Sequence, residues 1–223
     1  MVVRRASLLD GARAATGHAV IVDVFRAFTT AAFCIGAGAR EIVLVAGHER
    51  ALAMKHEDPS LFLTGEIEGR PIAGFDIGNS PSAIEKLDLT GRRVVQRTSS
   101  GTQGVVAATK AHQVLLGSFV IAEATVRYLG RVARDVAVVA MGVGGATGAD
   151  EDEACADYIA ARLAGATPDV AAIVARLWEH EDPNWPEWFP RRDAELACEV
   201  DRFSFALPVV REGSLLVARP VLS

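Results

Sequence analysis

Ala19-Val20-Ile21-Val22-Asp23-Val24-Phe25-Arg26-Ala27-Phe28-Thr29-Thr30 is the stretch from which the fold is most directly inferred. Its first residues are apolar and mostly β-branched, as in a strand buried on both faces of a sheet. The residues after Arg26 indicate a helix that begins near Ala27. A buried strand followed at once by a helix is the repeating unit of α/β proteins, so the stretch predicts that class.

The same alternation continues along the chain. It predicts strands over residues 19–24, 41–45, 61–64, 93–96, 113–116, 136–140 and 215–218. It predicts helices over residues 27–35, 48–56, 102–111, 119–133, 151–164 and 168–180. We therefore expect an α/β fold whose mixed, largely parallel sheet is flanked by helices on both faces. A single domain over residues 1–223 is expected, with a sub-division near residues 100–115 as the alternative.

The composition is that of a globular protein, with 223 residues, 23 basic and 28 acidic side chains, and a net charge of −5. Lys and Arg are not clustered, so neither nucleic acid nor an anionic membrane is expected as a partner. The first residues lack the apolar run of a signal peptide, and a cytoplasmic location is expected. Cys34, Cys155 and Cys198 form no CxxC motif, so neither a disulfide framework nor a zinc site is indicated.

Ligands of α/β proteins bind beyond the carboxyl ends of the strands, where this chain carries four polar clusters. The first contains Asp23, Arg26, Thr29 and Thr30. A carboxylate suits a hard cation such as Mg²⁺, whereas a guanidinium and a helix N-terminus suit phosphate oxygens. The alternative is that Asp23 caps the helix, with Thr in its first turn.

The second cluster lies in the Gly-rich segment 64–81 and contains Glu66, Asp76 and Asn79. Glycines and a proline fix an irregular backbone there, which brings carboxylates and an amide close to a ligand. The alternative is an ordinary turn before a helix that starts at Ser80-Pro81.

The third cluster is the hydroxyl-rich turn Arg97-Thr98-Ser99-Ser100-Gly101-Thr102. Its amides and hydroxyls suit an anion, and Arg97 would add positive charge. Ser and Thr also cap many helices, which is the alternative interpretation.

The fourth cluster, Asp150-Glu151-Asp152-Glu153, follows a Gly-rich loop. Four consecutive acids favour a cation over a bare pyrophosphate. A capping box with Asp150 at N-cap and Glu153 at N3 would explain two of them, and would leave Glu151 and Asp152 without a structural role.

Two other phosphatase signatures are disfavoured. Cys34 and Arg40 have the Cys-x5-Arg spacing of cysteine phosphatases, but Cys34 falls late in a predicted helix and Arg40 precedes a strand, the reverse of that motif. Phe25 stands where a haloacid-dehalogenase phosphatase has its second Asp.

The four clusters together resemble the 2-phosphosulfolactate phosphatase family. The family pattern Asp-Val-x-Arg-Ala-x-Thr-Thr is matched by residues 23–30, Gly-Phe-Asp-x-Gly-Asn-Ser-Pro by residues 74–81, and Glu-Asp-x-x-Cys-Ala by residues 151–156. Residues 98–102 match more loosely, and Cys198 with Asp201 fits a late Cys-x-x-Asp region. The resemblance implies an Mg²⁺-dependent α/β enzyme of coenzyme M biosynthesis that converts 2-phospho-3-sulfolactate to 3-sulfolactate and phosphate.

This resemblance and the clusters together assign expected roles. The expected catalytic residues are Asp23, Arg26, Glu66 and Asp76, and the expected Mg²⁺ ligands are Asp23, Glu66, Asp76, Glu151 and Asp152. The expected phosphate-binding residues are Thr29, Thr30, Asn79, Arg97, Thr98, Ser99, Ser100, Gly101 and Thr102. Which acid serves as general acid or base is left open.

Two positions depart from the family pattern. Ile67 follows Gly65-Glu66 where the family usually has Arg, and Ser100 replaces an Asn. A hydrogen bond to a charged group contributes roughly 1.5–3 kcal/mol, so the loss of one Arg contact changes specificity more than tenfold. The expected substrate is therefore a small phosphorylated acid of open identity.

Alternative functions are a phosphotransferase or mutase built on the same site, and a non-catalytic phosphate-binding module. Residues 182–190 hold three prolines and three aromatic residues, which predicts a rigid loop packed on the core, on a second subunit or over the site. A homodimer is left open on that basis.

Overall fold

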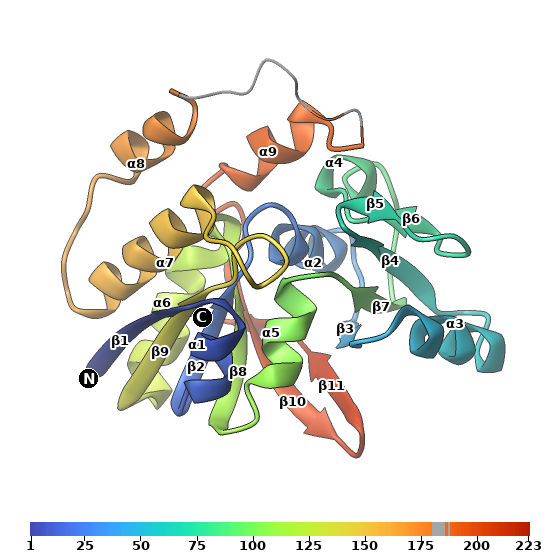
Figure 1. The fold of residues 1–223 in the computed structure, drawn as a ribbon, viewed down its shortest axis with the longest axis horizontal. Helices are drawn as coiled ribbons and strands as arrows, with labels where there is room; N and C mark the ends of the chain where they lie inside the picture. The colour runs from blue at the N-terminus through green and yellow to red at the C-terminus, as the bar shows by residue number, and fades with distance from the viewer. Residues whose placement is uncertain (180–185, 187) are drawn as a thin grey trace.

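The computed structural model describes residues 1–179, 186 and 188–223 (Figure 1). The strands are β1 (Val2–Ser7), β2 (Gly17–Val22), β3 (Glu41–Leu44), β4 (Phe62–Ile67), β5 (Arg70–Pro71), β6 (Ile77–Gly78), β7 (Arg93–Arg97), β8 (Ala111–Gly117), β9 (Asp135–Ala140), β10 (Phe205–Glu212), β11 (Leu215–Ala218) and β12 (Val221–Leu222). The helices are α1 (Leu8–Ala14), α2 (Ala27–Gly36), α3 (His48–Glu57), α4 (Pro81–Ile84), α5 (Gly101–Ala107), the 3₁₀ helix η1 (Phe119–Ile121), α6 (Ala122–Val132), α7 (Asp150–Leu163), α8 (Val170–Leu177) and α9 (Arg191–Ala197).

The strands form one sheet in the order β1-β9-β2-β8-β10-β11-β3-β7-β4-β5. β1, β9, β2 and β8 are parallel to one another, and so are β3, β7 and β4. The antiparallel hairpin β10–β11 joins the two groups. The predicted mixed, largely parallel sheet is therefore confirmed, and each predicted strand overlaps an observed one.

The twist of this sheet decides where the ligand groups meet. Three antiparallel pairings lie between β8 and β3, so along the sheet order the second parallel group runs opposite to the first. Six pairings separate β2 from β4, and a twist of roughly 20–25° per pairing adds up to about 120–150°. The accumulated twist turns the reversed strands back toward the direction of the first group, so residues after β2, β4, β7 and β9 lie around one pocket.

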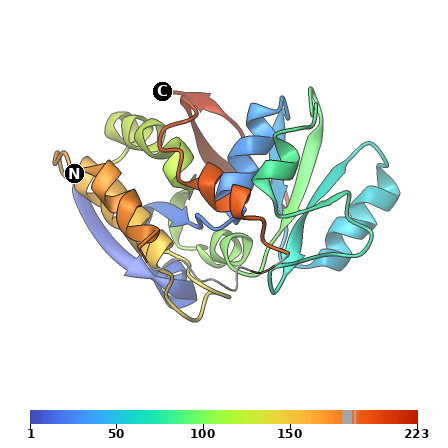
Figure 2. The same ribbon diagram turned by 90° about the horizontal axis from the view of Figure 1, so that it is seen from above.

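Helices cover both faces of the sheet, as predicted. Along β2, Ala19 and Ile21 pack into the core with α1, α2 and α5, whereas Val20 and Val22 pack into the core with α6 and α7. A third cluster packs α3 against β3, β4 and β7. Figure 2 shows α8, in orange, beside α7 at one end of the molecule, with α3, in cyan, at the other.

Several predicted boundaries differ from the observed ones. The predicted helix 102–111 ends at Ala107, because β8 already begins at Ala111. The predicted helix 119–133 begins with the 3₁₀ turn η1 before α6. The predicted helix 168–180 is shorter than expected, since α8 spans Val170–Leu177. Of the predicted loop 182–190, only residues 186 and 188–190 are described.

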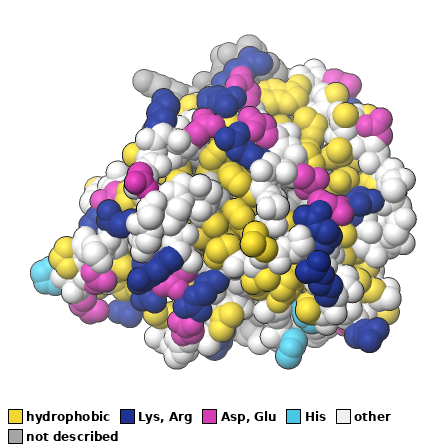
Figure 3. Space-filling view, turned by 180° about the vertical axis from the view of Figure 1, so that it is seen from behind, with side chains coloured by type: hydrophobic (Ala, Val, Ile, Leu, Met, Phe, Trp, Pro, Cys, Tyr) yellow, Lys and Arg dark blue, Asp and Glu magenta, His cyan; other side chains and the backbone are white. Residues whose placement is uncertain are grey.

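The charge distribution on the surface and the length of the helices are relevant to whether nucleic acid or a membrane is a partner. On the described part of the face in Figure 3, Lys and Arg side chains lie interspersed with Asp and Glu. None of the helices within residues 1–179 and 188–223 has the length and apolar character needed to cross a membrane.

Candidate active site

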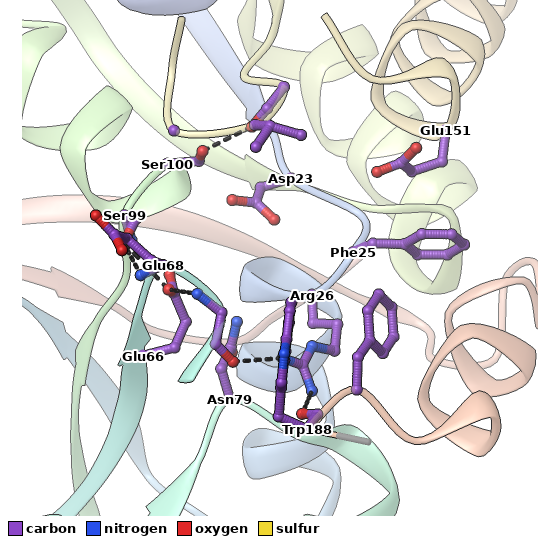
Figure 4. A pocket seen from close by; sticks show the side chains of 15 residues that line it. Asp23, Phe25, Arg26, Glu66, Glu68, Asn79, Ser99, Ser100, Glu151 and Trp188 are labelled. Atoms are coloured by element: carbon purple, nitrogen blue, oxygen red, sulfur yellow. Dashed lines mark hydrogen bonds between the residues drawn. The ribbon is translucent and has the colours of Figure 1, made fainter. Parts of the chain in front are cut away.

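A pocket of about 390 Å³ opens where the ends of β2, β4, β7 and β9 meet (Figure 4). We call it the candidate pocket. Its described lining residues are Asp23, Phe25, Arg26, Glu66, Glu68, Gly69, Asn79, Ser99, Ser100, Gly142, Val143, Gly144, Glu151, Trp188 and Phe189. All four polar clusters contribute at least one residue, and the volume falls in the range of small-molecule sites.

Asp23 lies at the centre of the candidate pocket, directly after β2 (Figure 4). Its Oδ1 accepts a hydrogen bond of 2.9 Å from the amide of Ala27, at the start of α2. Burial raises the pKa of Asp23 to about 6, and the negative charge of Glu66 adds to the rise. The helix-capping alternative and the ligand-binding role are thus compatible, because one oxygen holds the helix while the carboxylate remains in the pocket.

Gly101 packs directly against Asp23. A Cβ on Gly101 would lie 2.8 Å from Asp23 Oδ2 and 2.9 Å from the Phe28 ring. Any side chain at this position would therefore displace the carboxylate, which explains why glycine occupies the first position of α5.

Glu151 faces the same space from the first turn of α7. Figure 4 shows its carboxylate above the ring of Phe25 and directed toward Asp23. Burial raises the pKa of Glu151 to about 7, with contributions from the charges of Asp23 and Asp150. Two acids with elevated pKa values in one cavity can bind a cation or transfer a proton.

Asp152 has a structural role that the sequence did not indicate. Its two oxygens accept hydrogen bonds from the amides of Val24, at 2.6 Å, and Gly142, at 2.8 Å. The side chain thereby joins the end of β2 to the loop after β9. Burial, with the charges of Asp23 and Glu151, raises its pKa well above the usual range.

The alternative interpretation of residues 150–153 as a capping box is wrong. The N-cap residue is Ala149, which makes no side-chain capping bond. Glu153 instead bonds Arg5 Nη2 and the Ser7 hydroxyl, both at 2.5 Å. Strand β1, which the sequence analysis missed, supplies these partners and ties α7 to the sheet edge.

Glu66 is buried and organises the backbone around it. Oε1 accepts the amide of Ser99 at 2.5 Å, and Oε2 accepts the amide of Gly69 at 2.6 Å.

The structure does not bring Asp76 into the candidate pocket. The Asp76 carboxylate instead pairs with Lys55 and accepts the amide of Leu63. The expected convergence of five acids therefore does not occur.

Arg26 is buried, at 5% exposure, and held by protein acceptors. Its Nη1 donates to Asp193 Oδ2 at 2.9 Å and to the carbonyl of Trp188 at 3.3 Å, and Nη2 donates to the carbonyl of Gly69 at 3.1 Å. The guanidinium carbon lies 4.3 Å from the centre of the Phe189 ring. Sequence reasoning missed Asp193, because it lies far along the chain and no spacing links it to Arg26.

The hydroxyl-rich turn divides into structural and pocket-facing residues. Thr98 and Thr102 hydrogen-bond each other, since each backbone amide donates to the other's side chain at 3.1 Å or less. Ser99 and Ser100 line the candidate pocket. Ser100 also donates to the carbonyl of Gly142 at 2.6 Å, which fixes the loop after β9.

The remaining expected phosphate-binding residues are placed differently. Arg97 is outside the pocket lining, and its guanidinium donates to the carbonyls of Ala46 and Glu66. Thr29 donates to the carbonyl of Val24. Thr30 is buried away from the lining, and its hydroxyl has no partner among the described residues. Asn79 lines the pocket, and its buried side-chain oxygen likewise has no partner within the described part of the chain.

The family described as 2-phosphosulpholactate phosphatase matches residues 5–195. The chain belongs to this family. Membership places it in the class of phosphoric monoester hydrolases, which confirms the resemblance drawn from the motifs.

Three relatives of the family, each named "Probable 2-phosphosulfolactate phosphatase", illustrate the match. The chain is 33% identical over 153 residues to the protein of Bacillus subtilis (strain 168), which covers 69% of this chain and 67% of the relative. It is 40% identical over 135 residues to that of Deinococcus radiodurans, 60% of this chain and 56% of the relative. It is 34% identical over 208 residues to that of Thermus thermophilus, 91% of this chain and 86% of the relative.

The geometry also excludes the cysteine-phosphatase alternative for this family member. Cys34 is buried inside α2, and Arg40 directly precedes β3, as expected. Burial raises the pKa of the Cys34 thiol far above its usual range, so it carries no thiolate nucleophile at neutral pH.

Proposed function

We propose that this family member hydrolyses a small phosphomonoester with the help of Mg²⁺. The observation that carries the proposal is the pair Asp23 and Glu151, two acids with elevated pKa values that face one cavity beside Arg26 and the Ser99–Ser100 turn. A small organic phosphate fits the volume, and donors for its oxygens surround the two acids.

The donor set suits Mg²⁺ better than a transition metal. Among residues 1–179, 186 and 188–223, no three His, Cys, Asp or Glu side chains are close enough to form an all-protein cage. Mg²⁺ is commonly held by only one or two carboxylates, with waters and substrate phosphate completing its shell. Asp23 and Glu151 would hold it, and the ion would offset their mutual repulsion and stabilise negative charge on the transferring phosphoryl group.

The protein groups position the substrate for the reaction. Water attacks phosphorus, the bond from phosphorus to the substrate oxygen breaks, and the departing oxygen takes up a proton. Because a carboxylate that holds Mg²⁺ is deprotonated, Asp23 and Glu151 would not deliver this proton, and water in the cavity would supply it. Arg26, Asn79 and the Ser100 amide would orient the phosphoryl oxygens.

The test is release of inorganic phosphate from 2-phosphosulfolactate, 2-phospholactate and phosphoglycolate, with Mg²⁺ and with excess EDTA. We expect release that depends on Mg²⁺ and is abolished by chelation. Full activity in EDTA would contradict the metal requirement. Transfer of the phosphoryl group without free phosphate would favour a phosphotransferase or mutase, and binding without turnover would favour a phosphate-binding module.

Asp76→Asn is the matched control for Asp23→Asn in this assay. Both changes neutralise one acid of the expected metal set, but only Asp23 lines the candidate pocket. Asp23→Asn should abolish most activity, whereas Asp76→Asn should retain most of it. A role in coenzyme M biosynthesis would follow only if 2-phosphosulfolactate is the preferred substrate.

A further inference from the structure

A second hollow, with a volume of about 370 Å³, adjoins the candidate pocket. We call it the adjoining hollow. Phe25 and Glu151 line both cavities, so the two are separated by no more than these side chains. A substrate with its phosphoryl group beside Asp23 and Glu151 can therefore extend past Phe25 into the adjoining hollow.

Helix α8 forms one wall of the adjoining hollow through Ile173, Arg176 and Leu177. These residues are three and four positions apart, which places them on one face of the helix. Ile173 and Leu177 are partly buried and pack into the core cluster that contains α6 and α7. Their packing holds Arg176, in the last turn of α8, at the hollow.

The facing wall comes from the start of α7, through Asp150, Glu151 and Ala154. Ala154 follows the two acids by one helical turn, and its side chain is a single methyl group. A residue this small leaves room between α7 and α8 for part of a ligand. The adjoining hollow thus lies between a helix that carries the candidate catalytic acid Glu151 and a helix that carries a cation.

The guanidinium of Arg176 is free to bind a ligand. Arg176 is the one cationic side chain among the described residues that line the adjoining hollow. It is exposed, and within residues 1–179, 186 and 188–223 it forms no hydrogen bond or ion pair, although Asp150 and Glu151 line the same hollow. All five of its N–H donors therefore remain available, in the planar arrangement that matches a carboxylate or a sulfonate.

The other guanidinium groups near the site are already engaged. Arg26 is held by one carboxylate and two backbone carbonyls, and its remaining donors suffice for the phosphoryl group. Arg97 is outside the pocket lining and is turned to two backbone carbonyls. A phosphorylated acid carries at least one further anionic group, and Arg176 is the cation that the adjoining hollow offers to it.

We propose that the adjoining hollow is a subsite for a second acidic group of the substrate, a carboxylate or a sulfonate, and that Arg176 binds this group. The proposal rests on the proposed hydrolysis of a phosphomonoester and names the residue that recognises the acid. Because Arg176 contacts the substrate away from phosphorus, its loss should raise KM and leave kcat nearly unchanged.

Four phosphate esters show which acidic group Arg176 binds. 2-Phospho-3-sulfolactate carries a carboxylate and a sulfonate, 2-phospholactate carries the carboxylate alone, the phosphate ester of 2-hydroxypropane-1-sulfonate carries the sulfonate alone, and isopropyl phosphate carries neither. All four have the phosphoryl group on a secondary carbon. The variant Arg176→Gln should raise KM about fivefold or more for the compounds that carry the bound group, the low end for a charge-assisted contact, because Arg176 is exposed.

The pattern across the four compounds decides the proposal. An increase in KM confined to the sulfonate-bearing compounds identifies a sulfonate subsite, one confined to the carboxylate-bearing compounds identifies a carboxylate subsite, and an increase for all three acidic compounds shows that either group is bound. In each case KM for isopropyl phosphate should stay within about twofold. An equal increase for isopropyl phosphate, or no increase for any compound, would overturn the proposal.

Arg131→Gln is the matched control. Arg131 and Arg176 are both exposed and lie in the last turns of α6 and α8, but Arg131 lines neither cavity. An equal increase in KM in both variants would show that net charge alone is responsible, and would overturn the proposal. Arg176→Lys keeps the charge, so its KM should lie closer to that of the unmodified protein than the KM of Arg176→Gln does. A lysine variant as impaired as the glutamine variant would contradict the role of the charge.

Calorimetric titration of the same compounds in the presence of Mg²⁺ separates this proposal from the proposed function. If none of the four releases phosphate, the proposed hydrolysis fails, but the dissociation constants still decide the subsite. Weaker binding of 2-phospho-3-sulfolactate to Arg176→Gln than to Arg131→Gln, by about fivefold or more, supports the proposal. Equal dissociation constants for the two variants, or no measurable binding to the unmodified protein, would overturn it.

Discussion

Asp193→Ala tests the buried ion pair that holds Arg26 in the candidate pocket. The two side chains are 4% and 0% exposed and 2.9 Å apart. The other oxygen of Asp193 accepts the Ser80 hydroxyl at 2.8 Å and the amide of Ser82 at 2.9 Å. Removing the carboxylate would leave a buried guanidinium, an amide and a hydroxyl without their acceptor.

Loss of one partner of a buried ion pair costs roughly 3–5 kcal/mol, because the remaining charge is desolvated without compensation. We expect Asp193→Ala to lower the free energy of unfolding by about that amount, measured by urea denaturation with fluorescence or circular dichroism. Asp193→Asn should cost less, since its amide oxygen can still accept from Ser80 and Ser82. This milder variant keeps the test usable if Asp193→Ala is too unstable to purify.

Arg192→Ala is the control on the same helix. Arg192 is 49% exposed, and its ion pairs to acids are 3.4–3.8 Å long, so its loss should cost less than about 1 kcal/mol. The double variant Arg26→Met/Asp193→Ala should be more stable than the sum of the single changes predicts, because it removes the stranded charge. A cost for Asp193→Ala no larger than that for Arg192→Ala, or strict additivity in the double variant, would refute the role given to this pair.

Asp23→Asn should lower turnover at least a hundredfold. Burial raises the pKa of Asp23 to about 6, so the protonated carboxyl stabilises the native protein fully below about pH 4, and this stabilisation is lost as the pH rises through 6. In EDTA, the melting temperature of Asp23→Asn should therefore fall less steeply over that pH range than that of the unmodified protein. Cys34→Ser should leave turnover nearly intact, and native Cys34 should resist alkylation at pH 8; a thousandfold loss of activity in a folded variant would revive a thiolate mechanism. Gly101→Ala should impair phosphate release by displacing Asp23 or Phe28, whereas an active variant with unchanged KM would show that the close approach is not required.

The order of elements could be predicted because each β-branched run is short and is followed by helix-forming residues. Strand β10 was missed because Pro208 lies inside it, and proline argues against a strand that is paired on both sides. Its neighbours β8 and β11 nevertheless flank it on both sides. The hairpin that reverses the second half of the sheet therefore could not be inferred from local pattern, although it decides the topology.

The sequence predicted that the candidate site lies at the ends of several strands, but it did not predict what each side chain does there. Asp23, Glu66, Ser99 and Ser100 do meet in one pocket, because strand ends gather where the sheet twist brings them together. Asp76 follows a motif of equal clarity, yet pairs with Lys55 outside the pocket. Sequence spacing shows which residues leave a strand together, but not the direction in which each side chain points.

The distribution of hydrogen bonds explains how so many acids share one region of the fold. Glu66 and Asp152 each accept two backbone amides, and these bonds connect the ends of separate strands. Amide donors offset part of the cost of burying a carboxylate and fix its position. Asp23 also accepts two backbone amides, from Ala27 at the start of α2 and from Gly101 at the start of α5, but its carboxylate lines the pocket. Glu151 lines the pocket from the first turn of α7. The framework acids thus shape the cavity, and Asp23 and Glu151 remain as the pair whose elevated pKa values a cation or a proton would relieve. A substitution at Glu66 or Asp152 should therefore reduce stability and activity together, whereas one at Asp23 or Glu151 should separate the two.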